Sequence, residues 1–188
     1  MSLFDPDVPD GFHYRADFLT VEEERALATA IDDVSFDTFE MRGVVARRRV
    51  KFYGRAYADI PSAPMPDFLL PLRAKIAGWA NVPADAFVMG LINEYTRGAT
   101  IGWHRDAPQY DITAGVSLLS SCRMRLRPYV RPRDVANHGP GKRRRTTHEI
   151  VLEPRSGYLI TGVARNDFEH SIPATDSLRY SITFRTLR

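Results

Sequence analysis

FVMGLINEY, residues 87–95, begins the part of the chain that decides its fold. The segment is short and rich in apolar, β-branched and aromatic residues, which is typical of a strand buried in a sheet. Helical spacers that could connect parallel strands do not follow it, so the pattern predicts an antiparallel double-layer barrel or jelly roll. The strand-like segments that follow it are DITAGVSLLSS (111–121), CRMRLRPYV (122–130), TTHEIVLEP (146–154), SGYLITG (156–162) and LRYSITFRTLR (178–188).

Two helices are expected ahead of these strands. Thr20 and Glu23 have the spacing of a capping box, and apolar residues then recur at helical spacing as far as Ile31. A second helix is expected over residues 67–80, with Pro71 in its first turn, where proline is tolerated. The fold class is therefore expected to be α+β and mainly β, with N-terminal helices in residues 1–86 bracing a β core in residues 87–188. One domain of 188 residues is expected.

The composition indicates a globular protein, with 44% hydrophobic and 26% charged residues. Cys122 is the only cysteine, which excludes an internal disulfide and fits a reducing compartment. The acidic N-terminal stretch lacks the apolar core of a secretory signal, and no apolar run approaches the roughly 18 residues that a membrane span needs. We therefore expect a cytoplasmic protein with no membrane partner, acting as a monomer.

Basic residues are concentrated in one part of the chain, although the net charge is only +3. Between Arg123 and Arg145 there are eight arginines, one lysine and a single acidic residue, Asp134. Such a block favours a polyanionic partner, with a solvated charged hairpin as the alternative. Residues 131–145 contain Pro and Gly without an apolar pattern, which predicts a long basic loop. Its candidates for contact with nucleic acid are Arg131, Arg133, Lys142, Arg143, Arg144 and Arg145.

The stretch IGWHRDAPQY, residues 101–110, contains a candidate metal site. His104 and Asp106 share a face if the segment is extended, and an imidazole beside a carboxylate can chelate a divalent metal. Two histidines and one carboxylate form the facial triad of non-haem Fe(II) oxygenases, while a zinc hydrolase site or an incidental hydrogen-bonded pair are alternatives. The possible third ligands are His13, His138, His148 and His170, of which His170 is best placed, just after the strand expected at 156–162.

The final strand, RYSITFR (179–185), has an arginine at each end, and alternation puts Arg179 and Arg185 on one face. The other face is apolar and is expected to pack into the body of the fold. Inward arginines are costly unless they meet anions, and arginine holds a carboxylate with two hydrogen bonds. A dicarboxylate such as 2-oxoglutarate fits this requirement. Asn93 and Tyr95 also share a face and could help to hold it, unless they are satisfied core groups and the arginines face solvent.

The chain resembles the AlkB-type Fe(II)- and 2-oxoglutarate-dependent dioxygenases over nearly its whole length. The resemblance implies a double-stranded β-helix fold, with Fe(II) as the metal and 2-oxoglutarate and O2 as cosubstrates. Five landmarks occur in the order found in that family: RRRVKFYG (47–54), INEYTRGATIGWHRDAP (92–108), GVSLLS (115–120), LEPRSGYLITGVARNDFEHSI (152–172) and RYSITFR (179–185).

The resemblance also implies residue roles. Residues 47–54 would lie in a lid over the substrate, within residues 1–86. Iron would be bound by His104, Asp106 and His170. The cosubstrate would be held by Asn93, Tyr95, Arg179, Ser181 (where the family often has Asn) and Arg185, the last at its metal-facing end. The substrate would be met by Arg49, Lys51, Tyr53 and Trp103.

The implied activity is oxidative demethylation or dealkylation of an alkylated nucleobase in DNA or RNA, as in repair, on a single strand or a flipped base. The basic block and the aromatic and basic residues of the lid favour this activity. Pro108 stands where some repair members have an acidic residue, which favours the same chemistry on a protein, lipid or small molecule as the alternative. A nucleic-acid-binding module without turnover is a third hypothesis, but it would not need the metal triad or the two arginines.

Overall fold

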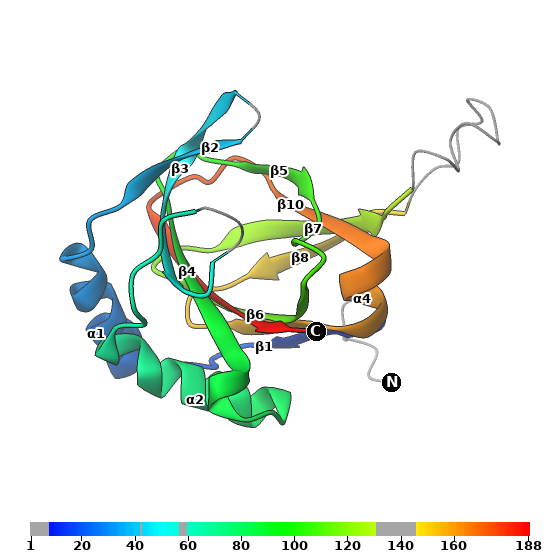
Figure 1. Cartoon of the computed structure of the whole chain (residues 1–188). Coiled ribbons are helices and arrows are strands. Elements are labelled where there is room, and N and C mark those ends of the chain that lie inside the picture. The colour runs from blue at the N-terminus through cyan, green and yellow to red at the C-terminus, as the bar shows by residue number, and fades with distance from the viewer. Residues whose placement is uncertain (1–7, 42, 57–59, 131–145) are drawn as a thin grey trace.

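The computed structural model describes residues 8–41, 43–56, 60–130 and 146–188. Their strands form two antiparallel sheets that lie face to face (Figure 1). A core cluster between the sheets combines Tyr95 and Tyr158 of one with Met124 and Leu126 of the other. The expected double-layer jelly roll is therefore confirmed.

The major sheet has the strand order β1-β9-β6-β11-β4-β3-β2, and the minor sheet has the order β5-β10-β7-β8. All six segments expected to be strands contain one. The major sheet comprises β1 (Phe12–Arg15), β2 (Asp37–Met41), β3 (Val44–Gly54), β4 (Phe87–Tyr95), β6 (Tyr110–Leu118), β9 (Gly157–Ile160) and β11 (Arg179–Leu187). The minor sheet comprises β5 (Ile101–His104), β7 (Cys122–Pro128), β8 (His148–Leu152) and β10 (Phe168–Ile172).

Residues 1–86 differ from the expectation of helices and a lid, because they also contribute β1, β2 and β3 to the major sheet. RRRVKFYG is most of β3, which pairs with β4 along Arg49–Gly54. Its strand character is hidden in the sequence by three consecutive arginines. Two of its charged side chains, Arg49 and Lys51, are neutralised by Glu94 and Asp37 once the sheet has formed.

Two helices cover the outer face of the major sheet (Figure 1). They are α1 (Val21–Asp32) and α2 (Leu70–Ala80), the latter preceded by a 3-10 turn at Asp67–Leu69. The expected capping box is present, since Thr20 Oγ1 accepts from the Glu23 amide and the Glu23 carboxylate accepts from the Thr20 amide. Ile31 of α1 and Ile76 of α2 are buried in the core cluster under these helices. Burial of these apolar side chains against the sheet, rather than helix propensity alone, stabilises both helices.

The strand β11 lies in the middle of the major sheet, paired with β4 on one side and β6 on the other. Tyr180, Ile182 and Phe184 pack into the helix-covered core. Arg179 and Arg185 are buried on the opposite face, which points between the two sheets. The alternative in which these arginines face solvent on an edge strand is therefore wrong.

The predicted basic loop at 131–145 lies outside the described residues, as do its six candidate cations and His138. A short helix, α4 (Gly162–Asp167), connects β9 to β10. Within the described ranges, no helix is both long enough and apolar enough to span a bilayer.

Candidate metal centre and cosubstrate pocket

His104, Asp106 and His170 come together between the sheets. His104 ends β5 and is paired with His170 on β10, and Asp106 follows β5 by two residues. One ligand atom from each of the three lies within 4.8 Å of the others, and the two imidazole centroids are 4.3 Å apart. The register of β5 against β10 thus brings His170, rather than His13 or His148, beside His104 as the third candidate ligand.

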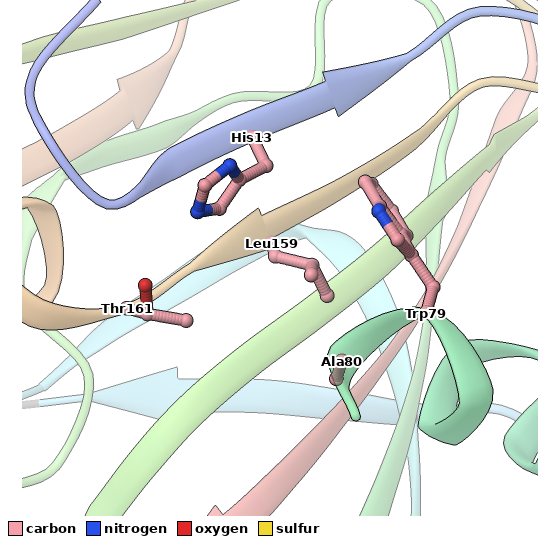
Figure 2. Close-up of a pocket in the computed structure, with 5 residues that line it drawn as sticks. All are labelled: His13, Trp79, Ala80, Leu159 and Thr161. Carbon is pink, nitrogen blue, oxygen red and sulfur yellow. The ribbon is translucent and has the colours of Figure 1, made fainter. Parts of the chain in front are cut away.

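The other described histidines lie away from this cluster. His148 on β8 has its ring centroid 5.9 Å from that of Phe168. His13 is on the edge strand β1 and lines a separate hollow of about 240 Å³, together with Trp79, Ala80, Leu159 and Thr161 (Figure 2). Trp79 and Ala80 belong to α2, so this hollow is on the helix-covered side of the major sheet. His13 is therefore not a partner for His104 and Asp106.

Burial favours the neutral form of both imidazoles, which is the form that binds a metal. It lowers the pKa of His170 to about 3, and it also lowers the pKa of His104, with smaller contributions from Arg185 and Arg48. Both rings are therefore neutral near pH 7, and a neutral imidazole offers the lone pair that a metal needs. The Nδ1 atom of His104 lies 2.9 Å from the Gly102 carbonyl oxygen, an arrangement in which Nδ1 donates and Nε2 is left free.

Asp106 is held as a carboxylate by two side chains. Burial alone would raise its pKa, but the guanidinium of Arg185 holds the pKa of this carboxyl well below its usual range. Arg185 Nη2 donates to Oδ1 at 2.8 Å, and Thr113 Oγ1 donates to Oδ2 at 2.6 Å. Supporting hydrogen bonds of this kind orient a ligating carboxylate. Sequence reasoning missed Thr113, although its place on a strand beside Gly115 and Ser117 put it on the inner face.

Arg165 of α4 anchors the loop that follows Asp106. Its side chain is buried, and Nη2 donates to the carbonyl oxygens of Asp106 at 3.4 Å, Ala107 at 2.7 Å and Tyr110 at 2.9 Å. The loop carrying one ligand is thereby tied to the helix that leads into β10 and His170. Nothing in the local sequence marks this arginine as buried, because its partners are backbone atoms of a distant loop.

Arg179 lies at the opposite end of β11 from Arg185, on the same inner face of the major sheet. It is fully buried, Nε donates to Ser117 Oγ at 2.9 Å, and its guanidinium carbon lies 5.1 Å from the centroid of the Tyr95 ring. Its two terminal nitrogens have no hydrogen-bond partner within the described part of the chain. A buried guanidinium with two free donors is suited to a carboxylate, so the residues present fit a dicarboxylate between Arg179 and the metal triad.

The sheet register places small and polar side chains around Arg179 on this inner face. Asn93 and Ser117 lie on either side of Ser181, and Tyr95 is opposite Arg179. Tyr158 lies over Gly115, where an added Cβ would be 2.5 Å from the tyrosine hydroxyl oxygen. Only glycine therefore lets this ring lie against β6. The predicted cosubstrate residues Asn93, Tyr95, Arg179, Ser181 and Arg185 all lie on this inner face.

The residues expected to meet the substrate lie elsewhere. Arg49, Lys51 and Tyr53 are on the opposite face of β3: Arg49 pairs with Glu94 at 2.7 Å, and Tyr53 is buried in the core cluster under the helices. Trp103 is adjacent to the inward-facing His104, so it points out of the minor sheet, with Arg127 4.0 Å from its ring centroid. The expectation of a lid at these four positions is therefore corrected, since strand alternation turns their side chains away from the metal cluster.

The described part of the basic block is largely ion-paired. Arg123 and Arg125 both contact Glu149, and Arg127 contacts Glu169 at 2.6 Å. These arginines lie on β7, on the face opposite to Leu126, which packs in the core between the sheets. The other six basic residues of the block belong to 131–145, outside the described ranges.

Comparison with known proteins agrees with this site. Residues 17–185 match the family model described as the 2OG-Fe(II) oxygenase superfamily, and the chain therefore belongs to that superfamily. The matched region is a domain of the 2OG-Fe(II) oxygenase type, and His104, Asp106 and His170 are residues that could hold the iron.

Individual relatives refine the comparison. An Arabidopsis thaliana protein named "Alkylated DNA repair protein ALKBH8 homolog" is 27% identical over 194 residues, covering 92% of this chain and 54% of the relative. The chain thus spans about half the length of this curated relative. This similarity supports the resemblance to AlkB-type enzymes.

Two solved structures share the fold. "The structure of OsALKBH1" superposes with a TM-score of 0.67 at 16% identity, over 95% of this chain and 99% of that one. A Pseudomonas putida prolyl-4-hydroxylase superposes with a TM-score of 0.62 at 14% identity, over 95% and 93% of the two chains. The jelly-roll architecture is therefore common to this chain and to both solved structures.

Proposed function

We propose that this dioxygenase oxidatively removes alkyl groups from nucleobases in DNA or RNA. The observation that carries the proposal is the similarity, over 92% of the chain, to a relative named for the repair of alkylated DNA. It is supported by the cluster of candidate metal ligands and by the buried, unpartnered nitrogens of Arg179, which suit Fe(II) and 2-oxoglutarate. A hydroxylated N-alkyl carbon breaks down to an aldehyde and a free amine, so hydroxylation at that carbon is sufficient for dealkylation.

In this proposal His104, Asp106 and His170 bind Fe(II), which together with 2-oxoglutarate and O2 supplies the oxidation of a C–H bond. Arg179 holds the distal carboxylate of 2-oxoglutarate through its two free nitrogens. Asn93, Tyr95 and Ser181 lie beside Arg179 on the inner face. Arg185 and Thr113 keep Asp106 ionised and oriented.

The proposal extends to the setting of the reaction. The enzyme would act in the cytoplasm, as a single domain and a monomer, on a single-stranded or flipped base in nucleic acid repair. Arg131, Arg133, Lys142, Arg143, Arg144 and Arg145 would contact phosphates, because their local charge is not offset along the sequence.

A second candidate is the same oxidation on a protein, lipid or small molecule. It is favoured by the exposed Pro108, two residues after Asp106, which offers no polar group to recognise a base. The prolyl-4-hydroxylase shows that the same fold occurs in an enzyme named for a different substrate.

A turnover screen separates the two candidates. The enzyme with Fe(II), ascorbate and 2-oxoglutarate is given methylated single-stranded DNA, methylated RNA, their unmodified counterparts or a proline-containing peptide, and succinate and formaldehyde are measured. Release of both products only with methylated oligonucleotides is expected. His104→Ala should abolish turnover, and His13→Ala, in the separate hollow, should not. Turnover with the peptide and with no oligonucleotide would replace the proposal by the second candidate.

A further inference from the structure

Arg48 is a cation on the inner face of β3 that the sequence did not single out. Because β3 alternates, Arg48, Val50 and Phe52 face the metal side of the major sheet while Arg49 and Lys51 face away. Val50 is paired with Asn93 of β4. Arg48 Nε donates to Asn93 Oδ1 at 3.2 Å, and its guanidinium carbon lies 4.8 Å from the centroid of the Phe39 ring.

The charge of Arg48 is not balanced by the described residues around it. Its neighbours along the strand pair with Glu94 and Asp37, whereas Arg48 has no acidic partner in the described ranges. It is half-buried, and burial lowers its pKa. Its hydrogen bond to Asn93 Oδ1 places it beside the inner face that carries the candidate cosubstrate residues. A partly desolvated cation in such a place favours an anionic ligand.

The cosubstrate does not need this cation. Arg179 has two unpartnered nitrogens that would hold one carboxylate of 2-oxoglutarate, and His104, Asp106 and His170 would hold the metal. Arg179 is 0% exposed, whereas Arg48 is partly exposed and can be reached from outside. Arg48 is therefore accessible to an anion other than the cosubstrate, such as one carried by the substrate.

We propose that Arg48 binds a backbone phosphate of the nucleic acid beside the alkylated base. This inference rests on the proposed function and specifies how the substrate is held. Asn93 and Phe39 fix the guanidinium through Nε and the ring face, and the terminal nitrogens make no hydrogen bond to any described residue. Those nitrogens supply the paired donors that suit a phosphate. Asn93 thus connects Arg48, which would bind the substrate, to the residues that would hold the cosubstrate.

The test compares Arg48→Gln and Arg48→Lys with Lys51→Gln, which removes one charge from the outer face of the same strand. Each protein is loaded anaerobically with Fe(II) and 2-oxoglutarate and titrated with a fluorescent single-stranded DNA carrying one N-methylated base, between about 50 and 200 mM salt. Affinity for 2-oxoglutarate without DNA is measured in parallel, and thermal unfolding checks that each variant is folded.

Arg48→Gln is expected to weaken DNA binding about tenfold, and to reduce the slope of log K against log salt by about 0.7, the value for one phosphate contact on a single strand. Arg48→Lys keeps the charge and should retain the slope. Lys51→Gln should keep the wild-type DNA affinity and salt slope. The affinity for 2-oxoglutarate should be unchanged in all three variants.

Three results would overturn the assignment. Wild-type affinity and salt slope in Arg48→Gln would show that Arg48 contacts no phosphate. A loss of 2-oxoglutarate affinity with DNA binding intact would make Arg48 a cosubstrate residue. If the wild type binds neither the methylated DNA nor an RNA oligonucleotide of the same sequence, the proposed function fails as well, which distinguishes that failure from the first two.

Discussion

Arg185 and Asp106 form an ion pair between the two sheets, with Nη2 2.8 Å from Oδ1 and side chains only 10% and 6% exposed. Arg185 is near the end of β11 and Asp106 is in the loop after β5, so the pair joins a central strand of the major sheet to the metal triad. Its partners are 79 residues apart in the sequence. A pair this deeply buried leaves an uncompensated charge if either member is removed.

Arg185→Gln is therefore expected to destabilise the metal-free protein by about 3 kcal/mol, measured by urea unfolding in the presence of a chelator. Added Mn(II) should restore part of the loss by compensating the Asp106 carboxylate. Arg123→Gln is the matched control, because Arg123 contacts Glu149 at the surface with 60% of its side chain exposed. That exposed pair should contribute at most about 1 kcal/mol. Equal losses in the two variants would contradict the buried-pair interpretation.

The metal-free protein should lose stability as the pH falls below neutrality. Burial lowers the pKa of His170 to about 3, whereas the unfolded histidine titrates near its ordinary value of about 6.5. Between these values the unfolded chain binds a proton that the folded protein does not, so stability falls with pH by up to about 1.4 kcal/mol per pH unit. Urea unfolding of the chelated protein at pH values from about 7 to 5 measures this slope. His170→Gln should reduce it and His13→Gln, on the outer side, should not; parallel slopes in all three proteins would refute the prediction.

Arg165→Met should weaken metal binding more than it weakens the fold. The side chain makes three hydrogen bonds to the loop after Asp106, and loss of such supporting contacts costs about 10- to 100-fold in metal affinity. Affinity is measured by anaerobic titration with Fe(II) or Co(II). The control is Arg188→Met, which also loses a bond to the Tyr110 carbonyl but none to Asp106 or Ala107. If both variants bind metal like the wild type, Arg165 does not position Asp106.

Arg179→Met is expected to have opposite effects on stability and on cosubstrate binding. Without cosubstrate, the guanidinium has two buried unpartnered nitrogens, so replacing it with an apolar side chain should leave the stability unchanged or raise it. Affinity for 2-oxoglutarate should fall by about 100-fold or more, because a buried charged contact is lost. Fe(II) affinity should be unaffected. The paired measurements are thermal unfolding and equilibrium binding of 2-oxoglutarate, and intact 2-oxoglutarate binding would rule out this role.

Gly115→Ala should disturb the pocket through Tyr158. A Cβ at this position would lie 2.5 Å from the Tyr158 hydroxyl oxygen, so the ring must move and overpacking should cost about 1–3 kcal/mol. Gly102→Ala is the matched control, because a Cβ there meets no atom of the described structure within 4 Å. Urea unfolding of both variants tests the contrast, together with their affinity for 2-oxoglutarate. If the two variants have the same stability and the same affinity for 2-oxoglutarate, the Tyr158 ring can move aside without loss of free energy of unfolding.

The class of fold and the inward residues of the regular strands could be predicted from the sequence. Alternation in RYSITFR separates the arginines from Tyr180, Ile182 and Phe184, and that separation is present in β11. The capping box at Thr20 predicts the start of α1, because its hydrogen bonds are local. The pairing of His104 with Asp106 also follows from local spacing. These features depend on residues that are close together in the sequence, so they can be predicted from the sequence alone.

The tertiary structure alone decided which face of a charged strand meets the site. RRRVKFYG has basic residues on both faces, so its alternation does not distinguish Arg48 from Arg49. The register of Val50 against Asn93 turns Arg48 toward the metal triad, and Glu94 holds Arg49 on the other side. In the same way, His170 is chosen over His13 by the pairing of β10 with β5, and Arg165 finds its carbonyl partners only across the fold. Such contacts join residues that are tens of positions apart in the sequence. They stabilise the protein only once the two sheets have formed, so local sequence patterns do not reveal them.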